Sequence, residues 1–351
     1  MMIRRPSRTA IALTATALSA TLLLTACGGD SSAKGSGGKL DVVASFYPME
    51  YLASQIGGEH VKVTDLTAAG VEPHDLELTA KQVASVKKAG AVVYLKGLQP
   101  TVDKAVADSG AKHVIDATAA SPLVDHHLGE GHSEGDGHDH AEAAGDPHLW
   151  LDPTRYAAVA KSVGAGFAKA DPEHAADYQK NTDDLVGRLT TLDQEFRDGL
   201  KDAGTRTFVT SHAAFGYLAE HYGLTQVAIN GVDPESEPTP ARLAEVQKAA
   251  KEHGVTTVFF ETLVSPKLAE TVAKDLGLKT AVLDPLEGVK TDASNGGPKD
   301  DYLTVMKRNL ANLQAALGAT TPAGTPASTP AAAATTPAAT APAATTPATT
   351  S

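Results

Sequence analysis

Histidine and acidic residues are concentrated in two neighbouring stretches of the chain. Residues 125–140 read DHHLGEGHSEGDGHDH, five histidines among Asp, Glu and Gly with hardly an apolar residue. His148 follows shortly after, in the more apolar sequence DPHLW at 146–150. Imidazole is the commonest protein ligand for borderline-soft metals, and it is ready to bind when neutral near pH 7. The first stretch predicts a solvated segment that can bind metal, and the second predicts one corner of a folded transition-metal site.

Four side chains that suit a metal stand after candidate β-strands or in an ordered-looking loop. They are His74, His148, His212 and Asp284. The carboxyl ends of strands line the ligand crevice in open α/β sheets. Because two of the four residues come from each half of the chain, we predict a metal site in a cleft between two lobes. Three imidazoles and one carboxylate form a four-coordinate set that suits Zn²⁺.

Each of these residues also has a simpler interpretation. A lone histidine in a loop is commonly a polar surface residue, and an Asp-Pro pair after a strand is commonly a turn or a cap. The histidine-rich stretch is predicted to capture metal as an accessory site, and its alternative is a solvated loop with no role. Its histidines are His126, His127, His132, His138 and His140. The remaining candidates are interpreted as structural or solvated, namely His60, His113, His174, His221 and His253.

The N-terminal residues predict export and a lipid anchor. Three arginines precede a short apolar stretch at 11–24, which has the layout of a secretory signal and is too short for a comfortable membrane span. The stretch ends in LTAC, which resembles the bacterial lipobox, and Cys27 is the only cysteine of the chain. We expect residues 1–26 to be removed and Cys27 to carry lipid, with residues 27–39 as a flexible tether. The alternative is an ordinary signal peptide with an incidental cysteine.

The middle of the chain predicts an α/β fold of two lobes. Short β-branched runs alternate with helical stretches, as expected for parallel sheets built from βαβ units. The candidate strands are 40–46, 61–66, 91–95, 113–115, 206–210, 224–229, 256–261 and 280–283. Apolar residues at helical spacing predict one helix from Pro172 to about Asp202, roughly 30 residues and about 45 Å long. We therefore predict an N-terminal lobe at 40–170, a rigid linker helix at 171–203 and a C-terminal lobe at 204–318.

Composition excludes several partners and sets the C-terminus apart. Residues 319–351 are almost only Ala, Thr, Pro, Ser and Gly, which predicts a disordered tail. The formal net charge is −12. No basic stripe lies outside the signal, so nucleic acid is not expected as a partner. The chain has no P-loop, so it does not itself hydrolyse nucleotide. We expect a monomer.

The motifs in their order resemble the zinc-binding subfamily of metal-specific solute-binding lipoproteins of ABC importers. The resemblance covers almost the whole folded region. Its motifs are ASFYPM at 44–49, GVEPHD at 70–75, DPHLWLDP at 146–153, TSHAAFGYL at 210–218, EPTP at 237–240 and LDPL at 283–286. The resemblance implies two α/β lobes joined by one long rigid helix. It also implies that His74, His148, His212 and Asp284 bind the metal.

Two positions depart from the family pattern, and neither removes a ligand. Ala213 stands where the family often has Asp, and GLQP at 97–100 replaces an acidic and aromatic pattern. Manganese-binding relatives tend to carry Glu at the position of His212. Since imidazole favours zinc and its neighbours over harder metals, zinc is the expected ion.

The expected function is capture of Zn²⁺ outside the cell and delivery to an ABC permease driven by a separate ATPase. The protein would be lipid-anchored at the outer face of the cytoplasmic membrane. One alternative is a surface zinc-buffering or adhesion lipoprotein on the same scaffold. The other is an extracellular zinc hydrolase, but four protein ligands would close the metal site and no HExxH motif is present. We therefore expect that the protein is not an enzyme.

Overall fold

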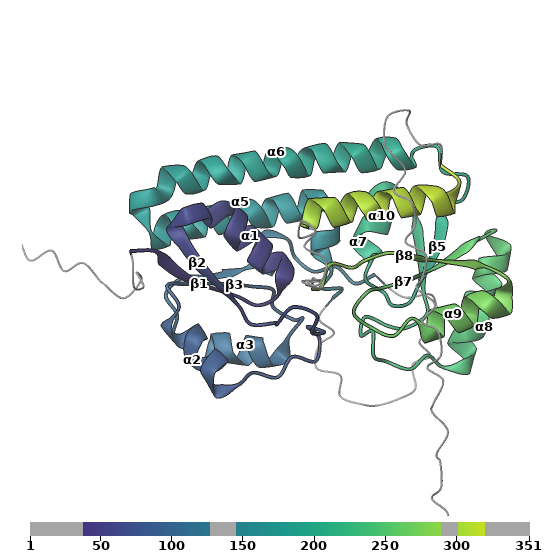
Figure 1. The fold of residues 1–351 in the computed structure, drawn as a ribbon, viewed down its shortest axis with the longest axis horizontal. Coiled ribbons are helices and arrows are strands. Elements are labelled where there is room, and N and C mark those ends of the chain that lie inside the picture. The colour runs from purple at the N-terminus through teal and green to yellow at the C-terminus, as the bar shows by residue number, and fades with distance from the viewer. Residues whose placement is uncertain (1–37, 127–144, 289–300, 320–351) are drawn as a thin grey trace, which may run out of the picture. The chain divides into compact units, whose positions relative to one another are not determined.

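A computed structural model describes residues 38–126, 145–288 and 301–319, which belong to one compact unit of the chain (Figure 1). The first half contains a four-stranded parallel sheet in the order β2-β1-β3-β4. Its strands are β1 (Leu40–Ala44), β2 (Val61–Asp65), β3 (Ala91–Tyr94) and β4 (Val114–Asp116). Parallel pairing sets Leu40 opposite Val61 and Val42 opposite Ala91. All of β3 is buried, as expected for a central strand covered by helices on both faces.

The second half repeats this architecture with the strand order β6-β5-β7-β8. Its strands are β5 (Thr207–Thr210), β6 (Thr225–Ala228), β7 (Thr257–Phe260) and β8 (Lys279–Val282), all paired in parallel. All eight strands match runs predicted from the sequence. The predicted two-lobe α/β fold is therefore confirmed.

Helices connect and cover the strands of both sheets. Those of the first half are α1 (Tyr47–Gly57), α2 (Ala80–Lys88), α3 (Pro100–Ala107), α4 (Ala117–Ala120) and α5 (Pro153–Ala170). They are followed by α6 (Ala175–Leu200), α7 (Gly216–Tyr222), α8 (Pro240–Glu252), α9 (Lys267–Leu276) and α10 (Tyr302–Leu317). Three short 3₁₀ turns lie at Gly58–His60, Leu149–Leu151 and Pro172–His174.

The long helix predicted from Pro172 to about Asp202 is present as α6, which has 26 residues and follows an opening 3₁₀ turn at Pro172–His174. It runs beside α1 and α5 of the first half and beside α10 of the second half (Figure 1). Leu185, Leu189, Leu192 and Phe196 recur on its buried face. These four side chains belong to one continuous apolar core with residues of α5 and α10. Because protein interiors are close-packed, this shared core resists a wide hinge motion between the halves.

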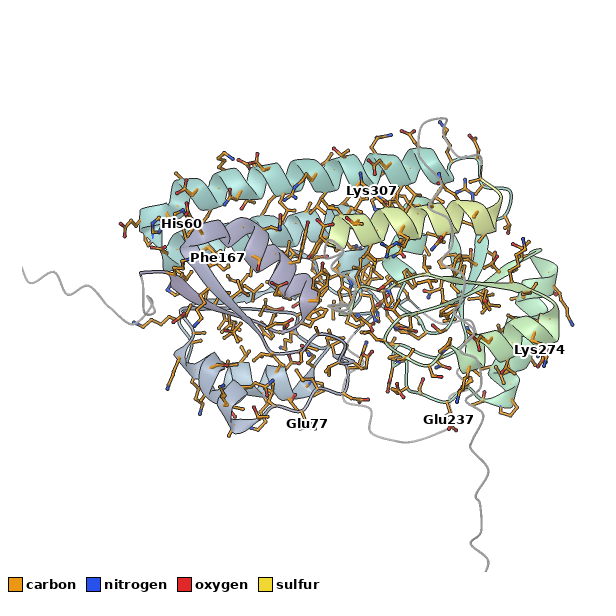
Figure 2. All side chains as sticks on the ribbon, viewed as in Figure 1. His60, Glu77, Phe167, Glu237, Lys274 and Lys307 are labelled. Carbon is orange, nitrogen blue, oxygen red and sulfur yellow. The ribbon has the colours of Figure 1, made fainter. Side chains whose placement is uncertain are left out.

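Polar contacts at the surface add to this packing of α6. Lys307 of α10, labelled in Figure 2, donates a hydrogen bond to Glu195 of α6 at 2.9 Å. Asn181 of α6 donates to the carbonyl oxygen of Ile56 at 3.0 Å. Helix α6 therefore contacts elements from both halves of the chain along its length.

Several predicted segments lie wholly or largely outside the described residues. These are the signal peptide at 1–26, the tether at 27–39 with Cys27, the tail at 319–351 and the histidine-rich stretch beyond His126. The division into lobes at 40–170 and 204–318 with a linker at 171–203 stays a prediction. In the part of the chain that the structure describes, no helix has the length and apolar character needed to cross a membrane.

Candidate metal centre

Three histidines and one glutamate bring their ligand atoms to one point between the two sheets. His74, His148, His212 and Glu287 each offer one atom, and these atoms lie within 4.8 Å of one another. His148, His212 and Glu287 are buried, and His74 is partly exposed. Across residues 38–126, 145–288 and 301–319, no other group of three or more His, Cys, Asp and Glu side chains meets this condition.

The loops after three strands carry three of these side chains. His74 follows β2, His212 follows β5 and Glu287 follows β8. His148 differs, because it lies between an isolated bridge at Asp146 and the 3₁₀ turn Leu149–Leu151 that leads into α5. The site nevertheless combines two residues from each half of the chain, as the sequence predicts.

The Glu287 carboxylate is the centre of the cluster. Its Oε1 lies 2.9 Å from Nε2 of His148, 3.1 Å from Nε2 of His212 and 3.3 Å from Nε2 of His74. Zinc–nitrogen bonds of about 2.0–2.1 Å in a tetrahedron place neighbouring ligand atoms about 3.3–3.4 Å apart. The three separations from Glu287 Oε1 to the histidine nitrogens are close to this spacing.

Two outer carboxylates orient two of the imidazoles. Asp146 Oδ1 lies 2.7 Å from Nδ1 of His148, and Glu261 Oε1 lies 2.8 Å from Nδ1 of His212. Ser211 donates its hydroxyl hydrogen to the same Glu261 oxygen at 2.5 Å. Because an ionised carboxylate only accepts hydrogen bonds, each Nδ1 carries the hydrogen. The Nε2 atoms are thereby directed toward the centre of the cluster, as in carboxylate–histidine–zinc arrangements.

The surrounding charges change the protonation of the site. Burial alone lowers the pKa of His212, but the negative charges and hydrogen bonds of Glu287 and Glu261 outweigh it and raise this pKa well above its usual value. For His148, burial is likewise outweighed by Asp146 and Glu287, and its pKa is raised. Burial opposes the ionised form of Glu287, yet the three histidines hold its pKa well below the usual range. A metal cation held at the centre would therefore compete with protons for the histidine nitrogens.

Three buried carboxylate oxygens around the histidines have no hydrogen-bond partner among the described residues. They are Oε2 of Glu72, Oε2 of Glu261 and Oε2 of Glu287. Burial, together with the charge of Glu287, raises the pKa of Glu72 to about 8. Buried polar atoms in native proteins are nearly always paired with protein, water or an ion, so acceptors beside the histidines suit a cation. The donor set fits a divalent metal.

Asp284, predicted as the fourth ligand, does not belong to the cluster. Its Oδ1 accepts a hydrogen bond from the backbone N–H of Leu286 at 2.8 Å, and its Oδ2 accepts one from Thr262 Oγ1 at 3.0 Å. Asp284 thus stabilises a turn, the simpler interpretation of an Asp-Pro pair. The carboxylate that meets the histidines is Glu287, three residues further on. The sequence contains a clue to Glu287, because LDPLEG at 283–288 has a second acid in the same turn.

The turn after β8 has an unusual backbone conformation. Leu286 has φ 58°, the one positive φ at a non-glycine position in the described ranges. Asn309 of α10 exchanges two hydrogen bonds with the backbone of Asp284, at 2.9 and 2.7 Å. Trp150 Nε1 donates to the carbonyl oxygen of Pro285 at 2.7 Å. A strained backbone conformation persists when surrounding contacts hold it in place. Here the contacts from Asn309 and Trp150 hold the turn in the conformation that points Glu287 toward the histidines.

Of the five accessory histidines predicted, only His126 lies in the described residues. Its Nδ1 is 2.8 Å from Asp146 Oδ2 and its Nε2 is 3.2 Å from Glu220 Oε2. To bind metal through one ring nitrogen, His126 would therefore have to leave the carboxylate that this nitrogen faces. His127, His132, His138 and His140 fall outside the described residues, so accessory capture stays a prediction.

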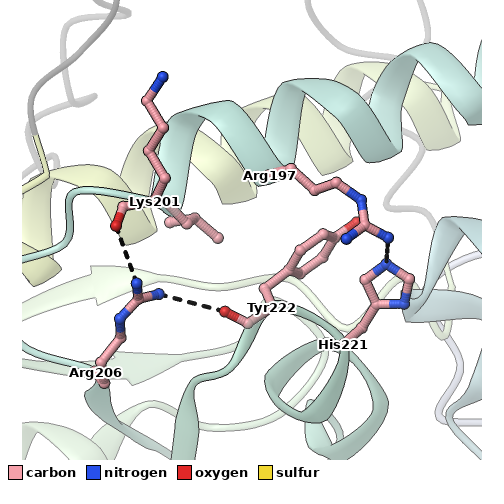
Figure 3. A pocket seen from close by; sticks show the side chains of 6 residues that line it. Arg197, Lys201, Arg206, His221 and Tyr222 are labelled. Atoms are coloured by element: carbon pink, nitrogen blue, oxygen red, sulfur yellow. Dashed lines mark hydrogen bonds between the residues drawn. The ribbon is translucent and has the colours of Figure 1, made fainter.

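A surface hollow of about 240 Å³ lies at the C-terminal end of α6 (Figure 3). It is lined by Arg197, Leu200, Lys201, Arg206, His221 and Tyr222. Arg206 donates to the carbonyl oxygens of Lys201 at 3.0 Å and Tyr222 at 3.3 Å. These carbonyls lie at the C-terminal ends of two helices, where cationic side chains commonly satisfy free backbone groups. The hollow is distinct from the histidine–glutamate cluster.

Comparisons with known proteins find relatives named for zinc uptake and zinc binding. A family model described as "Zinc-uptake complex component A periplasmic" matches residues 42–316. The high-affinity zinc uptake system protein ZnuA of Bacillus subtilis is 39% identical over 314 residues, which cover 86% of this chain and 96% of that protein. Zinc-binding protein AdcA of Streptococcus pyogenes is 38% identical over 294 residues and 79% of this chain. The match spans only 56% of that longer relative.

A solved structure shares the fold. The Zn(II)-bound ZnuA-like domain of Streptococcus pneumoniae AdcA has a TM-score of 0.66 and 34% sequence identity, covering 80% of this chain and 99% of that domain. The family model covers most of the described residues, including all four members of the cluster. The chain therefore belongs to the ZnuA family of zinc-uptake complex component A proteins.

Proposed function

We propose that this protein captures Zn²⁺ outside the cytoplasm and delivers it to an ABC permease driven by a separate ATPase. The ion is the transported substrate, held by His74, His148, His212 and Glu287. The observation that carries the proposal is the convergence of three imidazoles and one carboxylate within 4.8 Å. Imidazole-rich sets favour zinc, whereas harder metals favour oxygen ligands.

The closed ligand set supports transport over catalysis. A catalytic zinc normally keeps one coordination position open for water, whereas four protein ligands leave none open in a tetrahedral site. The outer carboxylates Asp146 and Glu261 hydrogen-bond to ligand histidines and orient them. We therefore propose that the protein is not an enzyme and that its product is a bound ion presented to a partner.

We further propose that the mature protein acts as a monomer anchored through lipid on Cys27. The LTAC sequence supports the anchor, and relatives with lipoprotein in their names include AdcA of Streptococcus pneumoniae. The continuous core around α6 supports delivery through small local adjustments. The family and the Bacillus relative are both named for zinc uptake, which favours import over the surface-buffering or adhesive alternative.

The only tryptophan of the chain provides an assay for the site. The rings of Trp150 and His148 have centroids 5.2 Å apart, so Trp150 emission should change when His148 binds an ion. We would titrate metal-free mature protein with Zn²⁺ in competition with a chelator. One tight site should be present in the wild type and in His253→Ala, whose exposed side chain lies outside the cluster, and lost in His212→Ala.

Growth in low zinc then separates import from buffering. A strain that depends on this protein should lose growth with His212→Ala and keep it with His253→Ala. Tight zinc binding without any growth requirement would contradict the uptake function and favour the surface-buffering alternative.

A further inference from the structure

His126 contacts the same carboxylate, that of Asp146, that hydrogen-bonds to His148 of the metal centre. Asp146 Oδ2 lies 2.8 Å from His126 Nδ1, and Asp146 Oδ1 lies 2.7 Å from Nδ1 of the ligand His148. Asp146 is only 4% exposed, so both of its oxygens act in a poorly solvated environment. His126 and His148 are thus linked through one buried carboxylate.

The contacts of His126 hold its ring in place at the start of the histidine-rich stretch. Its side chain is 18% exposed, and its Nε2 faces Glu220 of α7 at 3.2 Å. Its ring stands edge-on to Tyr217, with centroids 4.4 Å apart. The ring therefore has a fixed position between helix α7 and Asp146.

Tyr217 also fixes the backbone on both sides of the stretch. Its hydroxyl donates to the carbonyl oxygen of Asp146 at 2.7 Å and accepts from the backbone N–H of Val124 at 2.8 Å. Val124 and Asp146 form an isolated antiparallel bridge, in which Asp146 N donates to Val124 O at 2.9 Å. The chain therefore leaves and re-enters the described fold at one place, directly beside a metal ligand.

Gly216 makes room for this arrangement. A Cβ atom at Gly216 would lie 2.6 Å from Asp146 Oδ2 and 2.6 Å from Cγ of His126. Neither atom can move away without weakening the His126–Asp146 contact. The close approach of α7 thus depends on the absence of a side chain at this position.

We propose that His126 is a positioning residue that orients His148 for zinc through Asp146. With Oδ2 held by His126, the carboxylate plane is fixed and Oδ1 stays on the Nδ1–H of His148. Oδ1 also accepts from the backbone N–H of His148 at 2.9 Å, so without His126 the carboxylate keeps its two contacts to His148 and loses the one on Oδ2. The imidazole then loses part of its fixed orientation. This inference rests on the proposed zinc function and adds a role that differs from metal capture by His126.

Two substitutions test the contacts of the two His126 nitrogens independently. The amide nitrogen of Asn occupies about the place of Nδ1, whereas the longer Gln places its amide nitrogen near Nε2. His126→Asn can still donate to Asp146, and His126→Gln can donate only to Glu220. His174→Gln is a matched control, because His174 is 24% exposed and its Nδ1 contacts Asp171 at 2.6 Å. It stacks on His60 and not on a residue of the metal cluster.

The measurements are zinc affinity by chelator competition, zinc release into excess chelator, and thermal unfolding of each metal-free variant. We expect His126→Gln to weaken affinity and speed release by about 10-fold, the lower end for outer partners of ligand histidines. His126→Asn and His174→Gln should stay within about 2-fold of the wild type, because the Asp146 contact is kept. Gly216→Ala should resemble His126→Gln.

A double-mutant cycle tests whether the effect passes through Asp146. Asp146→Asn alone should weaken affinity about 10- to 100-fold. Adding His126→Gln in that background should change affinity little, because coupled residues are not additive. Additive losses, equal losses in His126→Asn and His126→Gln, or wild-type affinity and release in His126→Gln would each overturn the positioning role. Failure of the wild type itself to bind zinc would instead overturn the proposed function.

Discussion

The choice between Glu287 and Asp284 as the fourth ligand is testable with two isosteric amides. Glu287→Gln keeps the shape of the side chain and removes its negative charge. Apparent binding free energies of structural zinc sites are about 10–16 kcal/mol, so one ligand in four accounts for about 2.5–4 kcal/mol. Since about 1.4 kcal/mol corresponds to tenfold, the loss is about 100- to 1,000-fold in affinity.

One effect partly offsets this loss. Glu287 helps to raise the pKa of His212 and of His148 in the metal-free protein, so its removal lowers the proton's competition with zinc. We therefore expect a net weakening near the lower end, about 100-fold at neutral pH.

Asp284→Asn is the matched comparison. The amide oxygen of Asn can still accept from the Leu286 N–H, so the turn is kept and affinity should change by less than about threefold. The assay is chelator competition followed through Trp150 emission, with thermal unfolding to show that both variants fold. If Asp284→Asn weakened binding as much as Glu287→Gln, the assignment of Glu287 would be refuted.

Further perturbations test the pH dependence of binding, the role of Glu261 and the packing of α6. Zinc affinity should fall as pH decreases, beginning above the usual histidine pKa of about 6.5, because bound protons must leave the raised sites; equal affinity at about pH 7.5 and pH 5 would contradict this. Glu261→Gln should weaken zinc binding about 10- to 100-fold by releasing His212, measured by competition. In thermal unfolding, Gly164→Ala should destabilise by about 1–3 kcal/mol, because its Cβ would overlap Thr182 on α6. Its control, the exposed Gly187→Ala, should stabilise by about 0.5–1 kcal/mol.

Much of the metal site could be predicted from local sequence. His74 and His212 follow β-branched runs that become strands, and parallel strands bring their carboxyl ends to one edge. The apolar spacing of Leu185, Leu189 and Phe196 predicts the long helix, because buried helical faces repeat every three to four residues. These patterns lie within single segments, so they can be recognised without knowing which other segments those segments contact.

The carboxylate of the site could not be assigned in this way. Asp284 and Glu287 lie three residues apart after the same strand and are equally plausible by type. Their roles depend on the backbone at Leu286, whose φ of 58° coincides with contacts from Asn309 and Trp150 to the turn. Those two residues are distant from the turn in sequence, so no local pattern predicts which acid faces the histidines.

The same reason applies to the carboxylates behind the imidazoles. Glu261 follows β7, yet it meets His212 because β5 and β7 are neighbours in the sheet. His126 meets Asp146 beside the bridge between Val124 and Asp146, where Gly216 of α7 leaves room for both side chains. Residue type and periodicity are enough to predict the α/β class and the long helix, whereas His74, His148 and His212 are predicted as ligands through their motifs and the family resemblance. Which acid joins the histidines, and which side chains lie behind them, depends on contacts between segments far apart in the chain, so these features are visible only in the folded structure.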